Sequence, residues 1–87
     1  MAYDVHMNQL VLYTTSTCQY CWEMREYLRA THIPFFEKQI DLAPEAALEV
    51  AALVGDQVVP VVAIMTETAP KVVIGLDKQR LQMYYRR

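Results

Sequence analysis

The chain has 87 residues, 54 % of them hydrophobic, and its formal net charge of −2 is close to neutral. This length suits a single domain over residues 1–87, and the charge gives no indication of a nucleic acid or an anionic membrane as a partner. The longest apolar stretch, Val58–Met65, is too short to span a membrane. With no export signal and only two cysteines, we expect a monomer in the reducing cytoplasm.

The first half of the chain alternates between strand and helix patterns. Residues 9–13 predict a short buried strand, and the polar segment Thr14–Thr17 predicts a loop. A helix is expected from about Gln19 to Thr31, because apolar residues recur along one stripe of it, and Ile33-Pro34 ends it. Residues 35–40 alternate in the manner of a second strand.

A second helix is expected after that strand. Asp41–Pro44 opens it, since proline suits a first helical turn, and Gly55 is a stop signal. We predict that Leu48, Ala51 and Ala52 form its inner face. This helix connects the second strand to the apolar segment that follows it.

The last third of the chain predicts two strands and a helix. Val58–Met65 is β-branched and nearly continuous, as expected of a strand that is covered on both faces. Lys71–Ile74 forms a further strand, Gly75-Leu76 a bend, and Asp77 the N-cap of a last helix. The order β-α-β-α-β-β-α predicts an α/β fold in which helices flank a mixed sheet.

Cys18 and Cys21 are the only cysteines, and they lie where the first strand gives way to the first helix. Residues three apart on a first helical turn share a face, so their sulfurs can bond with little backbone movement. A disulfide across so short a loop hardly constrains the unfolded chain, and it would add little stability. The pair therefore indicates redox chemistry.

The two cysteines are expected to have different roles. Cys18 precedes the first helical turn, where unpaired N–H groups and the helix dipole favour a thiolate. Cys21 lies one turn inward, on the stripe of Met24 and Leu28, which shields it. Cys18 is thus the candidate nucleophile of thiol–disulfide exchange and Cys21 the resolving thiol, with no bound cofactor and no metal required.

Three motifs resemble the glutaredoxin family. The segment Tyr13–Cys21 resembles the strand, the loop and the C-P-Y-C active site of these proteins, with Gln19 in place of the proline. Val58-Val59-Pro60 is similar to their T-V-P motif, whose proline is cis, and Gly75-Leu76-Asp77 is similar to their late G-x-D motif. The resemblance covers nearly the whole chain and implies a thioredoxin-like fold with a central four-stranded mixed sheet.

The resemblance also implies a substrate groove and its partners. We expect protein disulfides as substrates and glutathione as reductant or co-substrate. Val59 and Pro60 would present backbone to the substrate, and Gly75 and Asp77 would shape the far side of the groove. The residues expected to bind substrate or glutathione are Thr15, Tyr20, Val59, Pro60, Gly75, Leu76 and Asp77.

Some positions depart from the family pattern. Thr15 stands where glutaredoxins usually carry a lysine that pairs with the glycyl carboxylate of glutathione, and Lys78 stands where a second acid is usual. Lys71, Lys78 or Arg80 would have to supply the missing positive charge. The alternative within the same chemistry is a redoxin that serves ribonucleotide reductase and is reduced by thioredoxin reductase, although the W-S-G-F-R-P sequence of that group is absent.

Two hypotheses that assign the protein to other functional classes remain open. One is a dimer that shares a zinc ion or an iron–sulfur cluster through the cysteines, although His6 and His32 lack metal-site spacing. The other is a non-catalytic binding module that uses aromatic residues near the site, although such a module has no need of both cysteines. For Trp22 we expect a core or semi-buried position.

Overall fold

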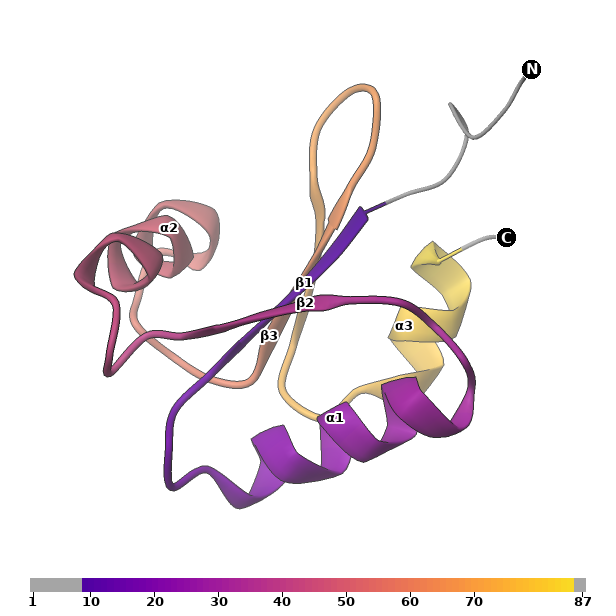
Figure 1. Ribbon diagram of the computed structural model, residues 1–87. Helices are drawn as coiled ribbons and strands as arrows, with labels where there is room; N and C mark the ends of the chain where they lie inside the picture. The colour runs from indigo at the N-terminus through magenta and orange to yellow at the C-terminus, as the bar shows by residue number, and fades with distance from the viewer. Residues whose placement is uncertain (1–8, 86–87) are drawn as a thin grey trace.

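The computed structural model describes residues 9–85 (Figure 1). Its elements follow in the order that the sequence predicts. They are β1 (Gln9–Thr14), α1 (Gln19–Ala30), β2 (Phe36–Gln39), α2 (Pro44–Val54), β3 (Val61–Met65), β4 (Lys71–Ile74) and α3 (Lys78–Tyr84). In this described part of the chain, no helix is both long and apolar enough to cross a membrane.

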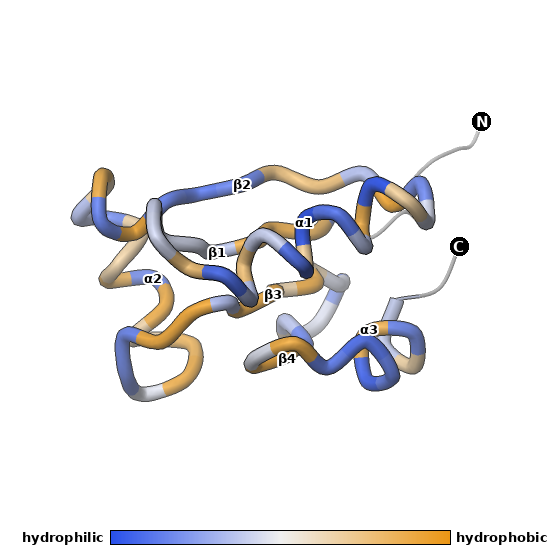
Figure 2. The backbone as a smooth tube through the Cα atoms, turned by 90° about the horizontal axis from the view of Figure 1, so that it is seen from below, coloured by the Kyte–Doolittle hydropathy of each residue, from blue (hydrophilic) through white to orange (hydrophobic). Residues whose placement is uncertain are grey.

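The four strands form the expected mixed sheet, in the order β2-β1-β3-β4. β1 pairs in parallel with β2 and antiparallel with β3, and β3 pairs antiparallel with β4. β1 and β3 are therefore central and β2 and β4 are edges. In Figure 2 the chain is hydrophilic along most of β2 and hydrophobic along β3, as their positions in the sheet require.

Alternate side chains of β1 enter two separate cores on opposite faces of the sheet. Figure 1 shows α1 and α3 on one face and α2 on the other. The core under α1 and α3 consists of Leu10, Leu12, Met24, Leu28, Ile33, Val62, Ile64, Val73 and Leu81. The core under α2 consists of Val11, Tyr13, Ala46, Val50, Val61 and Ala63.

The inner face of α2 differs from the prediction. Ala46 and Val50 are buried against the sheet, whereas Leu48 is 68 % exposed. Ala51 is half-buried and Ala52 is exposed. Apolar residues occur almost all the way round this helix, so periodicity alone does not choose a face. Packing on the sheet chooses it.

The third strand begins later than predicted. β3 starts at Val61, and the Val59-Pro60 bond before it is cis, as the family motif implied. Pro60 has no N–H to donate to a strand ladder, so regular pairing begins at the next residue. Val58 and Val59 lie half-buried in the connection from α2.

The end of α1 carries a left-handed residue that is not glycine. His32 has φ of 58°, and its N–H donates to the Arg29 carbonyl at 3.1 Å. The Ile33 N–H donates to the Leu28 carbonyl at 2.9 Å, which completes a Schellman motif. A side chain with a Cβ is strained in this backbone region, where glycine is not.

Replacing His32 by glycine is therefore expected to stabilise the protein. We predict that His32→Gly raises the free energy of unfolding by about 0.5–1 kcal/mol, because relief of the left-handed strain exceeds the extra entropy of the unfolded chain. Thermal and denaturant unfolding measure the change. His32→Ala is the control, since it keeps the Cβ and should gain nothing. A His32→Gly variant no more stable than His32→Ala would contradict the strain argument.

Candidate active site

Three chain segments meet at one end of the sheet. The loop Thr15–Thr17 follows β1, Pro60 precedes β3, and Gly75 follows β4 (Figure 1). Val61, the first residue of β3, pairs with both the C-terminal end of β1 and the C-terminal end of β4. The topology thus brings the three motifs, which are far apart in the sequence, to the same end of the sheet.

Cys18 is the N-cap of α1. Its backbone is extended, and its Sγ accepts a hydrogen bond from the backbone N–H of Cys21 at 3.0 Å. Its carbonyl accepts the N–H of Trp22 at 3.2 Å, which begins the helix. The sulfur occupies the place of a capping oxygen, and the N–H groups around it favour the thiolate in the reduced protein.

Cys21 lies on the inner face of α1 and is fully buried, in line with Met24 and Leu28. Its Cα is 5.1 Å from that of Cys18, and the two sulfurs form a disulfide. Cys18 itself is half-buried. One sulfur is thus open to an approaching partner, while the other is reached through the first. An attacking and a resolving thiol require this difference.

A hydrogen-bonded ion pair lies beneath the cysteine loop. The Arg25 guanidinium on α1 donates through Nε and Nη2 to the Glu37 carboxylate on β2, at 2.8 and 2.6 Å. The buried hydroxyl of Thr14, the last residue of β1, donates to the same carboxylate at 2.9 Å. These bonds, chiefly the two from Arg25, hold the pKa of Glu37 below its usual value. β1, α1 and β2 are thereby joined where the loop begins.

A second carboxylate holds the loop from outside. The backbone N–H and the Oγ of Ser16 donate to Oδ2 of Asp41 at 3.2 and 2.6 Å. Sequence reasoning missed Arg25, Glu37 and Asp41 as parts of the site. For Asp41 a signal was present, because it follows β2, and the ends of adjacent parallel strands lie at the same edge of a sheet.

The predicted binding residues come from the cysteine segment and from the segment before β3. Thr15 is half-buried in the loop before Cys18, and Tyr20 is 61 % exposed on the first turn of α1. Val59 is half-buried next to the cis bond. Each of them lies at the end of the sheet that carries the disulfide.

The last motif is joined to the Pro60 segment by its backbone. The Gly75 N–H donates to the Pro60 carbonyl at 2.8 Å, and Gly75 has φ of 80°, a conformation that glycine adopts without strain. Leu76 packs on the core under α1 and α3. The Asp77 carboxylate accepts the N–H of Arg80 at 3.0 Å, so the predicted N-cap is confirmed.

A hollow lies beside the accessible sulfur. It is lined by Ser16, Thr17, Cys18, Gln19 and Trp22. The prediction of a core or semi-buried Trp22 is wrong, because its side chain is 52 % exposed. One residue past the buried Cys21 is a turn of about 100° around the helix, which takes Trp22 off the inner face.

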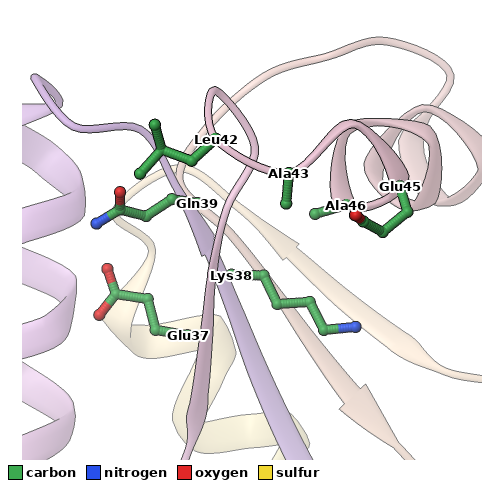
Figure 3. A pocket seen from close by; sticks show the side chains of 7 residues that line it. All are labelled: Glu37, Lys38, Gln39, Leu42, Ala43, Glu45 and Ala46. Carbon is green, nitrogen blue, oxygen red and sulfur yellow. The ribbon is translucent and has the colours of Figure 1, made fainter.

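A larger hollow lies at the edge of the sheet, away from the cysteines (Figure 3). The two ionic side chains that β2 contributes leave its opposite faces, with Glu37 directed to α1 and Lys38 to α2. Glu37 forms an ion pair with Arg25, and Lys38 forms one with Glu49 at 3.0 Å. We therefore place the chemistry in the smaller hollow, which contains the reactive sulfur.

The described residues offer little to a metal ion. Within residues 9–85, no group of three or more His, Cys, Asp or Glu side chains is arranged to hold one. His32 is exposed at the end of α1, and His6 lies outside the described residues.

A comparison with protein-family models gives one family for this site. The glutaredoxin model matches residues 10–77, which include both cysteines, Pro60 and Gly75-Leu76-Asp77. The chain belongs to the glutaredoxin family. The predicted thioredoxin-like fold is confirmed with it.

Solved structures of glutaredoxins and related redoxins superpose on the chain. A glutaredoxin from Archaeoglobus fulgidus is 26 % identical, with a TM-score of 0.73 over 88 % of this chain and 85 % of that one. NrdH-redoxin from Escherichia coli, a glutaredoxin-like protein with a thioredoxin-like activity profile, is 22 % identical, with a TM-score of 0.74 over 91 % of this chain and 97 % of that one. A buckwheat glutaredoxin–glutathione complex is 17 % identical, with a TM-score of 0.63 over 91 % and 71 %. No curated protein sequence matches the chain.

The ion pair beneath the loop makes a pH-dependent contribution to stability. Because the folded state lowers the pKa of Glu37, its contribution is complete above the unfolded value of about 4.3 and is lost as the pH falls through the folded value. We predict that Glu37→Gln lowers the free energy of unfolding by about 1–2 kcal/mol near pH 7, and that this difference shrinks below about pH 4.

Denaturant titrations between about pH 3 and pH 7 measure the difference. Glu26→Gln is the matched control, because its ion pair with Arg29 is exposed and should contribute less than about 0.5 kcal/mol. A Glu37→Gln penalty that is equal at all pH values would show that the carboxylate's charge is not what stabilises the loop.

Proposed function

We propose that this chain is a dithiol oxidoreductase that reduces protein disulfides and mixed disulfides of glutathione through Cys18 and Cys21. The observation that carries the proposal is the unequal pair of sulfurs. Cys18 caps α1 beside an open hollow, and Cys21 is buried within bonding reach of it. Membership of the glutaredoxin family supports the same chemistry.

The proposed reaction has two exchanges. The Cys18 thiolate attacks one sulfur of the substrate disulfide, and the other sulfur leaves as a thiolate that takes a proton from solvent. The Cys21 thiol then loses its proton to solvent and attacks Sγ of Cys18. The mixed disulfide breaks, the second substrate sulfur leaves as a thiolate that takes a proton from solvent, and the Cys18–Cys21 disulfide remains. The substrate has gained two electrons and two protons, which an external reductant must return to the protein.

We propose that the substrate binds in a groove whose walls lie on both sides of the disulfide. Thr15 and Tyr20 flank the attacking sulfur, while Val59 offers backbone to an extended partner and Pro60 adjoins it on the chain. The bond between Gly75 and Pro60 supports this placement, because it joins the late motif to the segment before β3. Leu76 and Asp77 would complete the far wall, and no bound prosthetic group is needed. We further propose that the protein acts as a monomer in the cytoplasm, where thiols are kept reduced.

Two reductants are candidates, glutathione and a thioredoxin reductase. Thr15 does not provide the cation that glutaredoxins usually offer to glutathione. The three possible substitutes are occupied, with Lys71 over the ring of Tyr84 at 5.6 Å, Lys78 over the ring of Tyr27 at 5.3 Å, and Arg80 3.4 Å from the carboxylate of Asp77. This favours the second candidate, a redoxin of the kind that serves ribonucleotide reductase.

The roles of the two sulfurs predict different defects. Cys18→Ser is expected to abolish disulfide reduction, because no nucleophile remains at the surface. Cys21→Ser is expected to accumulate mixed disulfides, because nothing resolves them. Mass spectrometry of the protein after incubation with a disulfide peptide measures both. Capture of the peptide by Cys18→Ser but not by Cys21→Ser would reverse the assignment, and inertness of both variants would refute the mechanism.

The source of electrons is tested by two coupled assays run in parallel. One supplies glutathione, glutathione reductase and NADPH, and the other supplies thioredoxin reductase and NADPH. We expect faster turnover of a protein disulfide with thioredoxin reductase, because the described cations already have partners. Efficient turnover with glutathione alone would instead require Lys71→Ala, Lys78→Ala and Arg80→Ala to identify the residue that binds its carboxylate.

A further inference from the structure

The charged side chains that the described residues place around the cysteine loop are acidic. Residues 15–24, which form the cysteine loop and the first turns of α1, contain one charged side chain, that of Glu23. None of the residues that line the hollow is basic. Asp41, which follows β2, brings a charge from another part of the fold to this loop, because it accepts both hydrogen bonds of Ser16.

Asp41 is an exposed carboxylate, and the described part of the chain gives it no cation. Its bonds from Ser16 lower its pKa, so it is ionised at neutral pH. Within residues 9–85, no Lys or Arg lies within ion-pair distance of it. Every lysine and arginine in this range has another partner, an acid or an aromatic ring. These residues are Arg25, Arg29, Lys38, Lys71, Lys78 and Arg80.

The position of this carboxylate is fixed by its contacts. Ser16 is two residues before Cys18, and two residues span at most about 7 Å of chain. Ser16 also lines the hollow, so a group bound there lies beside the residue that holds Asp41. The exposed ring of Trp22 on the same hollow offers a surface to the aliphatic stem and the charged end of a lysine or arginine.

We propose that Asp41 is a specificity-determining residue, which selects disulfides that carry a cationic group beside the reacting sulfur and disfavours anionic ones. The substrate class is a cysteine segment of a protein with lysine or arginine next to its disulfide. The inference rests on the proposed disulfide reduction, and the exchange itself is unchanged, since the cation binds and does not react. Glutathione, with two carboxylates and one ammonium group, belongs to the disfavoured class.

The size of the effect follows from Coulomb attraction in a solvated site. A unit charge about 8 Å from Asp41 changes the rate about two- to threefold, and salt weakens the change because the screening length falls to about 3 Å at 1 M. The attraction acts on the encounter with the disulfide. The rate change has opposite signs for cationic and anionic substrates. A general loss of loop structure would instead slow the reaction with every substrate.

Three small symmetrical disulfides test the proposal. They are cystamine, which is cationic, 2-hydroxyethyl disulfide, which is neutral, and 3,3′-dithiodipropionate, which is anionic. Each is mixed with the reduced protein, and oxidation is followed by the fluorescence of Trp22, the only tryptophan. Rates of Asp41→Asn are divided by those of the natural chain for each disulfide, so differences in leaving group cancel. Asn keeps an oxygen that can accept both Ser16 bonds.

We expect Asp41→Asn to lower the rate of oxidation by cystamine about two- to threefold relative to the rate with 2-hydroxyethyl disulfide. The rate with 3,3′-dithiodipropionate should rise by a similar factor. Both changes should fade at high salt. Asp41→Glu should retain the natural preference. Glu67→Gln is the matched control, because it removes one acid from the β3–β4 loop at the far end of the sheet (Figure 1) and should leave all three rates unchanged.

Equal rate ratios for all three disulfides would overturn the proposal while leaving the proposed reductase activity intact. Failure of the natural chain to react with any of them would refute the proposed function itself.

Discussion

The turn from β1 into α1 is the constraint on which the site depends. Thr14 is fixed in the sheet and Cys18 must cap the helix, so three loop residues have to cover the distance between them. The cap places one sulfur among free N–H groups, and the helix period then buries the other against the core. The chemistry of both cysteines thus follows from the point at which one helix starts.

Two carboxylates from the parallel neighbour strand hold that turn. Glu37 fixes its beginning from below through Arg25 and Thr14, and Asp41 fixes its middle from the solvent side through Ser16. The first is enclosed enough to act on stability, while the second is open enough to act on an approaching partner. The same kind of side chain thus has two effects, which burial separates.

The sequence predicts most of the fold, because strand and helix periods and the Pro and Gly signals are local. It also predicts Cys18 and Cys21 as a pair. It fails for the face of α2, where Val50 and not Leu48 turns inward, because a helix that is apolar all round has no preferred side until a sheet is present. It misses Asp41 because the contact joins two loops that are far apart in the sequence, and only the parallel pairing of β1 with β2 brings them to the same end of the sheet.

The separation of the molecule into two cores has a consequence for evolution and engineering. Cys21 belongs to the α1 side, whereas α2 packs on the opposite face through Ala46 and Val50. A substitution on the inner face of α2 therefore alters contacts with the sheet and leaves the contacts of the two cysteines unchanged. This layer is where the protein can acquire a new surface, a tag or a fused module while its reactive end keeps its geometry.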